Sequence, residues 1–187
     1  SVRCVQETGP SLDMVKRLQC EVIYAKQDAQ AALHWQGFYY VRYQQQLYRL
    51  TAEIYLAEQQ QVQTSPESIK FALKDCVQVL SGKFIIAPAQ FGLSPALLQQ
   101  ALHLQQRQGG EKIHLYGRVG TWPLKKAIQE AQIFPWARHT IQILSTDNVM
   151  LGVFTPKGFW LAQSAYCEAG GWLPISVSST LELNDEH

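Results

Sequence analysis

A polar stretch over residues 59–67 divides this 187-residue chain and limits what it can fold into. It opens with three consecutive glutamines, has no apolar period and ends in Pro66-Glu67, which is typical of a linker. The length allows two small domains. We therefore predict a first domain over residues 1–58, a linker over 59–67, a second domain over 68–178 and a disordered tail over 179–187.

The composition indicates a globular chain whose overall charge is too small to attract nucleic acid by itself. Hydrophobic residues make up 47% of it, the formal net charge is +1, and no apolar run approaches a membrane span. Cys4, Cys20, Cys76 and Cys167 lie far apart without a CxxC pair, so we expect reduced, buried thiols in a cytosolic protein. The chain begins at Ser1 and shows no signal peptide, as a fragment of a longer protein would.

The first domain is predicted to begin with a helix. Pro10-Ser11 opens it, with Ser11 as the N-cap. Apolar residues then recur at steps of three and four, which defines one helix face: Leu12, Val15, Leu18 and Val22.

A β-hairpin is predicted after this helix. The aromatic and β-branched runs 38–43 and 46–51 flank Gln44-Gln45, and the type of turn stays open because Asn-Gly and Asp-Gly are absent. Arg42 and Arg49 project from the hairpin among tyrosines. Taken alone, the hairpin is read as a half-buried sheet with solvated arginines.

The second domain is predicted to be α+β. Strands are expected at residues 70–80, 83–87 (stopped by Pro88), 112–118, 141–144, 149–154 and 159–162. Residues 94–107 are either a short helix capped by Ser94 or a loop that leads into a strand over 102–107. The whole chain is thus α+β, with a small helix-plus-hairpin domain before a C-terminal domain of short strands and a few helices.

Residues 117–138 read GRVGTWPLKKAIQEAQIFPWAR and contain a further predicted helix. Thr121 is expected to cap it, Pro123 to lie in its first turn and Pro135 to prevent its continuation. A core-facing stripe is formed by Leu124, Ala127, Ile128 and Ala131. Lys126 is expected opposite this stripe, Lys125 on its flank, and Trp136 as a core anchor after the helix.

Basic charge is concentrated around this helix. Residues 105–140, which we call the basic segment, hold two acidic residues and six basic ones, Arg107, Lys112, Arg118, Lys125, Lys126 and Arg138. The segment therefore carries +4 and the rest of the chain −3. This distribution predicts a phosphate-binding surface, to which free amides of a helix start after Gly120 would contribute. A solvated helix face accounts for the count equally well.

The sequence contains little that indicates catalysis. His34, His103, His114 and His139 are scattered, and neither HExxH, GxSxG nor a Walker loop occurs. Gly117-x-x-Gly120-Thr121 lacks the ending of a phosphate loop. We predict no catalytic residue and no metal ligand in this chain.

Residues 117–138 resemble the signature of the C-terminal domain of the bacterial tRNA(Ile)-lysidine synthetases (TilS, also called MesJ). The matching residues are Arg118, Gly120, Leu124-Lys125-Lys126, Gln129-Glu130, Pro135-Trp136 and Arg138. Phe134 and Gln142 depart from it, each standing where the family has proline. Residues 10–35, followed by VRYQQQLYRL, are similar to the family's middle domain, so the resemblance covers about residues 10 to 165.

The resemblance implies a ligase that joins lysine to the wobble cytidine of tRNA-Ile with the CAU anticodon, using ATP and Mg²⁺. The family's ATP site lies in an N-terminal domain with a Ser-Gly-Gly-x-Asp-Ser loop, which this sequence lacks. We therefore expect a non-catalytic tRNA-binding portion with no cofactor of its own. Its middle domain would lie beside the anticodon region and its C-terminal domain toward the acceptor stem. The expected tRNA contacts are Arg107, Lys112, Arg118, Lys125, Lys126, Arg138, Arg42 and Arg49.

Two other readings of the sequence compete with this one. One is a stand-alone RNA- or protein-binding module, and the other is a small-molecule enzyme with a Cys or His that cannot be placed. We further expect a cytoplasmic protein without a membrane segment, with a homodimer among its conceivable assemblies.

Overall fold

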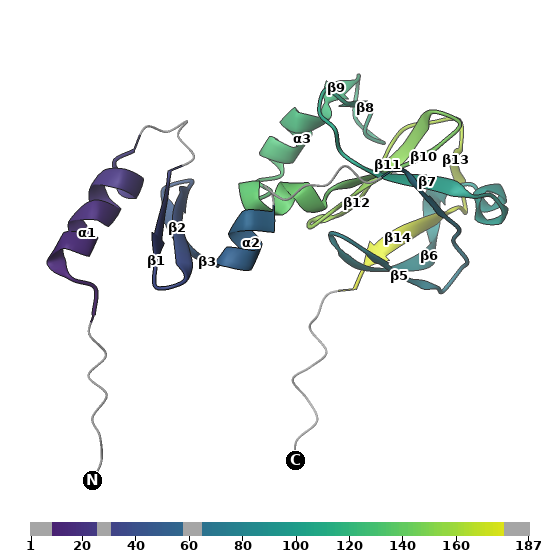
Figure 1. Cartoon of the computed structure of the whole chain (residues 1–187). Coiled ribbons are helices and arrows are strands. Elements are labelled where there is room, and N and C mark those ends of the chain that lie inside the picture. The colour runs from purple at the N-terminus through teal and green to yellow at the C-terminus, as the bar shows by residue number, and fades with distance from the viewer. Residues whose placement is uncertain (1–8, 26–30, 58–64, 178–187) are drawn as a thin grey trace, which may run out of the picture. The chain divides into compact units, whose positions relative to one another are not determined.

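The computed structural model describes residues 9–25, 31–57 and 65–177 (Figure 1). The chain divides into two compact units, Ser1–Gln60 and Gln61–His187, which are considered separately below. Cys4, residues 59–64 of the predicted linker and the predicted tail lie outside the described residues. No helix in the described ranges is long and apolar enough to cross a membrane.

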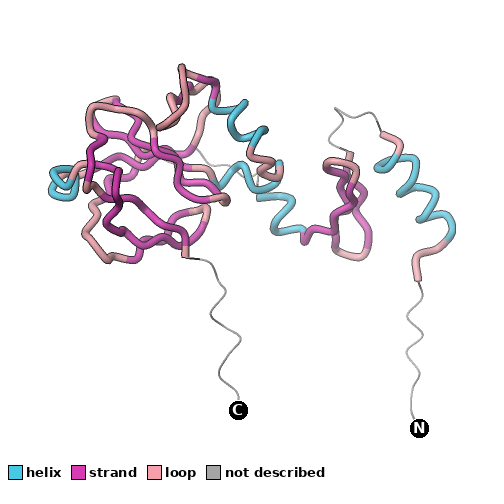
Figure 2. Tube along the Cα trace, turned by 180° about the vertical axis from the view of Figure 1, so that it is seen from behind, coloured by secondary structure: helices cyan, strands magenta, loops and turns pink. Residues whose placement is uncertain are grey.

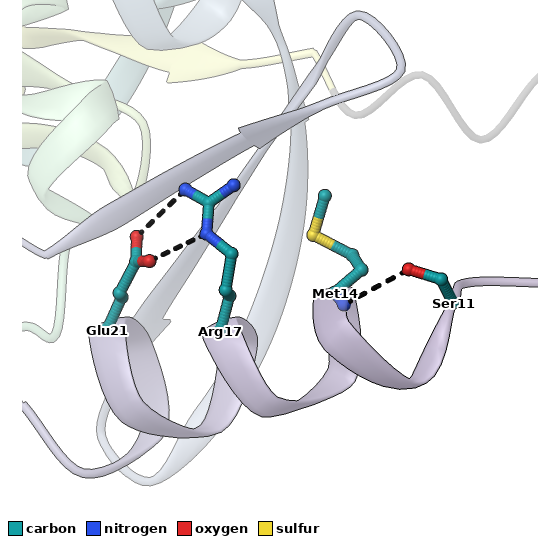
Figure 3. Close-up of polar contacts among 4 residues, drawn as sticks. All are labelled: Ser11, Met14, Arg17 and Glu21. Carbon is teal, nitrogen blue, oxygen red and sulfur yellow. Dashed lines mark hydrogen bonds and ion pairs between the residues drawn. The ribbon is translucent and has the colours of Figure 1, made fainter.

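The first unit begins with helix α1 (Leu12–Leu18), which continues into the π-helix η1 (Gln19–Ile23). Ser11 is the N-cap, as predicted, and its Oγ accepts a hydrogen bond from the Met14 amide at 3.2 Å (Figure 3). Val22 is fully buried, whereas Leu12 is 72% exposed. The predicted apolar face is therefore wrong at its first position.

A three-stranded antiparallel sheet follows, in the order β1 (Ala32–Trp35), β2 (Phe38–Tyr43) and β3 (Gln46–Thr51). The β2–β3 hairpin has the predicted ends. Gln44 and Gln45 both have positive φ, 46° and 64°, as in the type I′ turn that suits the twist of a two-residue hairpin. The sequence analysis missed β1.

Helix α2 (Ala52–Ala57) follows β3 directly. The Oγ1 of Thr51 accepts a hydrogen bond from the Ile54 amide at 3.3 Å, which gives α2 a side-chain cap. Tyr55 of α2 stacks on Tyr39 at 4.1 Å between ring centroids, and Tyr39 stacks on His34 at 4.6 Å. This aromatic row attaches α2 to the sheet.

The second unit is built mainly from antiparallel strands, with short helical segments between them (Figure 2). One sheet has the order β12 (Gly158–Leu161), β11 (Val149–Thr155), β10 (Gln142–Thr146), β7 (Leu102–Gln106) and β4 (Glu67–Ile69). Another pairs β6 (Gly82–Leu93) with β5 (Cys76–Val79), β13 (Cys167–Ala169) and β14 (Trp172–Ser176). A small ribbon joins β8 (Lys112–Ile113) to β9 (Trp122–Pro123). The fold is α+β, as predicted.

Three helical segments complete this unit: η2 (Pro95–Gln99), α3 (Leu124–Glu130) and η3 (Pro135–Thr140). Ser94 caps η2, as one of the two alternatives for that region had it. Two clusters of buried side chains form the core. The larger includes Phe84, Phe154 and Trp172, and the smaller packs Leu124 and Ile128 of α3 against strands β10 and β11.

Several predicted strand limits in the second unit are wrong. Strand β6 does not stop at Pro88 but continues to Leu93, because β5, β14 and β13 pair with it in succession. Of residues 70–80 only Cys76–Val79 form a strand, since Lys74 has a φ of 70° and ends a turn. Of residues 112–118 only the first two do so.

The cysteines are less buried than predicted. Cys20 and Cys76 are exposed and Cys167 is half-buried, and all three are free thiols. Cys20 lies on the outer side of η1, and Cys76 begins strand β5, whose one partner is β6. The predicted burial of these thiols is therefore wrong.

Candidate nucleic-acid interface

Helix α3 presents the predicted faces. Leu124 and Ile128 are at most 1% exposed and Ala127 is 7% exposed, so the apolar stripe is confirmed at three positions, whereas Ala131 follows the helix and is half-buried. Lys125 and Lys126 are exposed. The helix therefore packs on the smaller core cluster with one side and places two lysines on the surface with the other.

The start of α3 differs from the prediction. Pro123 occupies the N-cap position, so the expected cap by Thr121 is wrong. The helix has seven residues, begins at Leu124 rather than after Gly120, and its first amide donates to the Glu111 carbonyl at 2.8 Å. The prediction of an anion site formed by free helix amides directly after Gly120 is therefore wrong.

The β8–β9 ribbon brings Lys112 to the beginning of α3. Lys112 pairs with Pro123 across the ribbon, and β8, β9 and α3 lie next to one another in Figure 1. The carboxylate of the preceding Glu111 accepts hydrogen bonds from the amides of Gln108 and Gly109 at 2.5 and 2.7 Å. These hydrogen bonds close the loop before β8, and the Lys112 side chain is exposed.

Trp122 positions Lys126. The indole Nε1 donates to the Val119 carbonyl at 3.1 Å, and the Nζ of Lys126 lies 4.4 Å from the centroid of the indole ring. This cation–π contact holds the ammonium over a ring that is itself 38% exposed. The sequence analysis missed this role of Trp122, although its spacing of four residues from Lys126 is a usable signal.

Two arginines of the basic segment have partners within the unit. Arg118 pairs with Glu130 at 3.3 Å, with both side chains half exposed or more. The Nε of Arg138 donates to the Ile133 carbonyl at 3.1 Å. The Arg118 pair is of the exposed kind that contributes at most about 1 kcal/mol, so phosphate can compete for its guanidinium. Arg138 lies in η3, and its side chain reaches back to the turn that follows α3.

Arg107 completes the predicted set in the second unit. It directly follows β7 and is half-buried. The residue before it, Gln106, pairs with Gln142 at the start of β10. The strand pairing thus places Arg107 beside the chain that leaves η3.

Arg42 and Arg49, the two arginines of the first unit predicted to contact tRNA, both contact groups of their own unit. Arg42 donates to the carbonyls of Ile23 and Ala25, the latter at 2.7 Å, and so ties the end of η1 to the sheet. The guanidinium of Arg49 lies 4.6 Å from the centroid of the Phe38 ring. Both arginines therefore make contacts that support their own unit.

The described ranges do not bring together side chains that could bind a metal ion. They contain no group of three or more His, Cys, Asp or Glu side chains that could hold a metal ion. The exposed ammonium and guanidinium groups around α3 suit phosphate oxygens.

Comparisons with known proteins identify the class. Residues 102–173 match the family described as the TilS substrate C-terminal domain. The chain is 62% identical over 177 residues to the tRNA(Ile)-lysidine synthase of Acinetobacter baylyi, an alignment that covers 95% of this chain and 38% of that protein. It is 34% identical to the tRNA(Ile)-lysidine synthase of Legionella pneumophila, over 74% of this chain and 30% of that protein. A solved structure titled "Crystal structure of TILS C-terminal domain" aligns with a TM-score of 0.43 and 18% identity, over 62% of this chain and all of that one.

The second unit thus carries a TilS C-terminal domain. The chain belongs to the tRNA(Ile)-lysidine synthase family, as the residues around α3 predicted. It spans less than two fifths of the length of these two relatives.

Proposed function

We propose that this chain is the tRNA-binding portion of a tRNA(Ile)-lysidine synthase, the ligase that attaches lysine to the wobble cytidine of tRNA-Ile (CAU) with ATP. In this proposal the basic segment holds tRNA phosphates, while lysine, ATP and Mg²⁺ are used by the nucleotide-binding part of the whole enzyme. The purified chain would then bind tRNA without attaching labelled lysine to it.

The observation that carries this proposal is the placement of the basic segment's charges. Lys112, Lys125 and Lys126 are exposed around the beginning of α3, and among the described residues none of them forms an ion pair. Arg118 adds a guanidinium whose single acidic partner is exposed. Four basic side chains, Lys112, Arg118, Lys125 and Lys126, thus lie on α3 and on the chain that leads to it, within a basic segment of net charge +4, which suits an RNA backbone.

Phosphates are better candidates than base edges for these contacts. An A-form stem hides its major-groove edges from side chains, and lysine acts on phosphate as a point charge. Backbone contacts position a nucleic acid and carry little sequence information. We therefore expect the surface around α3 to bind isoleucine and methionine tRNAs alike and to leave their discrimination to other contacts.

The test is the affinity for tRNA at several salt concentrations. Lys112→Ala, Lys125→Ala, Lys126→Ala and Arg118→Ala are each expected to reduce the slope of log affinity against log salt by up to about one unit. Lys83→Ala is the matched control, because Lys83 is exposed on β6 and lies outside the basic segment. The control should keep the wild-type slope. An unchanged slope in all four variants would mean that α3 presents an ordinary solvated face.

A further inference from the structure

The second unit contains a hollow of about 540 Å³ beside helix α3. Aromatic rings from three separate parts of the chain, Phe91, Tyr116 and Trp160, contribute to its apolar lining, and Arg118 and Glu130 supply polar groups. A concave site of a few hundred Å³ with an apolar wall and a small number of polar groups is the usual form of a small-ligand site.

The rings of Phe91 and Tyr116 form a stacked pair in this hollow. Their centroids are 4.6 Å apart and their planes differ by 20°. The Tyr116 amide donates to the Leu161 carbonyl at 2.9 Å, which fixes the backbone under the ring. Tyr116 nevertheless stays 41% exposed, so the pair offers an aromatic surface that the fold leaves uncovered.

The polar lining supplies hydrogen-bond donors and acceptors together. Arg118 brings guanidinium donors and Glu130 a carboxylate acceptor, paired at 3.3 Å and half exposed or more. Because an exposed pair of this kind is weak, a ligand can separate it at little cost. A flat aromatic ligand with donors and acceptors along its edge matches both the stacked rings and this pair.

We propose that the hollow binds one unpaired nucleobase of RNA, which stacks on Tyr116 and meets Arg118 and Glu130 with its polar edge. The proposal rests on the tRNA-binding function proposed above. Arg118 belongs both to the hollow and to the basic segment, so the phosphates of a bound strand and the splayed base beside them would meet adjacent groups. Single-stranded nucleotides are commonly recognised in this way, by stacking on aromatic side chains next to a basic groove.

A base site in the hollow would change which RNA structures the second unit prefers. The lysines around α3 respond to the charge of a stem, whereas the hollow accepts a base only where the strand is unpaired. Together they would favour a junction between a stem and a single-stranded nucleotide over a continuous duplex.

The experiment uses an RNA hairpin with a short single-stranded 3′ overhang and a blunt hairpin of the same stem. The fluorescent base 2-aminopurine is placed at each overhang position in turn and titrated with the chain. Stacking on Tyr116 should quench its emission at one position. Tyr116→Leu should remove this quenching and weaken overhang binding about five- to tenfold, at the low end of the contribution of base–aromatic stacking. It should leave the affinity for the blunt hairpin unchanged.

Two further variants separate a binding role from a structural one. Tyr116→Phe keeps the ring and should restore both the quenching and the affinity. Glu130→Gln changes an exposed acceptor at the end of α3 and should alter the order of affinities for overhangs that carry A, C, G or U at the quenched position, with the melting temperature unchanged.

The outcomes distinguish this proposal from the one on which it rests. If tRNA binds with the expected salt slope but no overhang base is quenched, the hollow is not a base site and the phosphate surface stands. If overhang bases are quenched but folded tRNA does not bind, the base site stands and the tRNA function does not. If Tyr116→Leu affects no RNA affinity, as a hollow for a protein segment would require, the inference is overturned.

Discussion

The two units of this chain use their basic side chains in different ways. In the first unit Arg42 donates to two backbone carbonyls and Arg49 lies over Phe38, so both cations support the local fold. In the second unit Lys112 and Lys125 are exposed on the ribbon and helix that carry them. A basic side chain can thus brace the fold in one unit and form a surface for a partner in the other, and the geometry of its donors distinguishes the two cases.

The largest expected effect tests the side of α3 that packs into the core, opposite the exposed lysines. Leu124→Asp should destabilise the second unit by more than about 4 kcal/mol, because it places an unpaired carboxylate in the smaller core cluster. Lys126→Ala, two positions further on, should cost at most about 1 kcal/mol, since it removes one exposed cation–π contact. Urea unfolding measures both. Equal shifts for the two variants would mean that the faces of α3 are assigned wrongly.

A smaller effect tests whether Arg42 is a brace. Arg42→Lys keeps the charge but loses the fork that reaches two carbonyls, so it should destabilise the first unit by about 1.5–3 kcal/mol, and Arg42→Ala should do the same. The exposed Arg49 provides the control, and Arg49→Ala should cost at most about 1 kcal/mol. Hydrogen exchange of the β2 and β3 amides reports on this unit locally. If Arg42→Lys keeps full protection while Arg42→Ala weakens tRNA binding, Arg42 is an RNA contact instead.

The smallest effect concerns an exposed pair that is internal to α1 and η1. Arg17 binds both carboxylate oxygens of Glu21, at 2.8 and 3.3 Å, and this hydrogen bonding lowers the pKa of Glu21 (Figure 3). A lowered carboxyl pKa stabilises the folded chain above the pKa of the unfolded state, and the contribution is lost as the pH falls through the folded value. Carboxyl chemical shifts across the acid range should show the lowered pKa in the wild type.

The matched variants for this pair are Arg17→Gln and Lys16→Gln. The first should return the pKa of Glu21 toward its ordinary value, because the hydrogen bonds are lost. The second removes a charge from the same helical turn and should leave the pKa of Glu21 lowered. A Glu21 pKa that is the same in the wild type and in Arg17→Gln would show that the pair does not persist in solution.

Local features of the sequence predicted local structure well. The β2–β3 hairpin follows from two runs of aromatic and β-branched residues around a two-residue loop, and the buried stripe of α3 follows from its helical spacing. The signature around α3 also led to the family, which the comparisons confirm. Each of these patterns lies within a short window of the chain.

What the sequence could not show depends on distant residues. Arg42 reaches carbonyls 17 and 19 positions earlier, so its bracing role is invisible in its own hairpin. Strand β6 passes Pro88 because partners far along the chain extend its pairing. The hollow is lined by Phe91 of β6, Tyr116 of the turn after β8 and Trp160 of β12, and no local pattern relates them.

Strand β6 also bears on how the second unit reaches its native state. Its first residues pair locally with β5, but Phe84 pairs with Ser176, at the far end of the described chain. Pairings between such distant residues close large loops before they add stability, and folding slows as their share rises. The sheet around β6 can therefore close only after nearly the whole unit has been synthesised, whereas the β10–β11–β12 meander can form beforehand. A newly made chain would thus keep the partners of Trp172 exposed until the ribosome has released the last strand, which is when this unit is most open to aggregation.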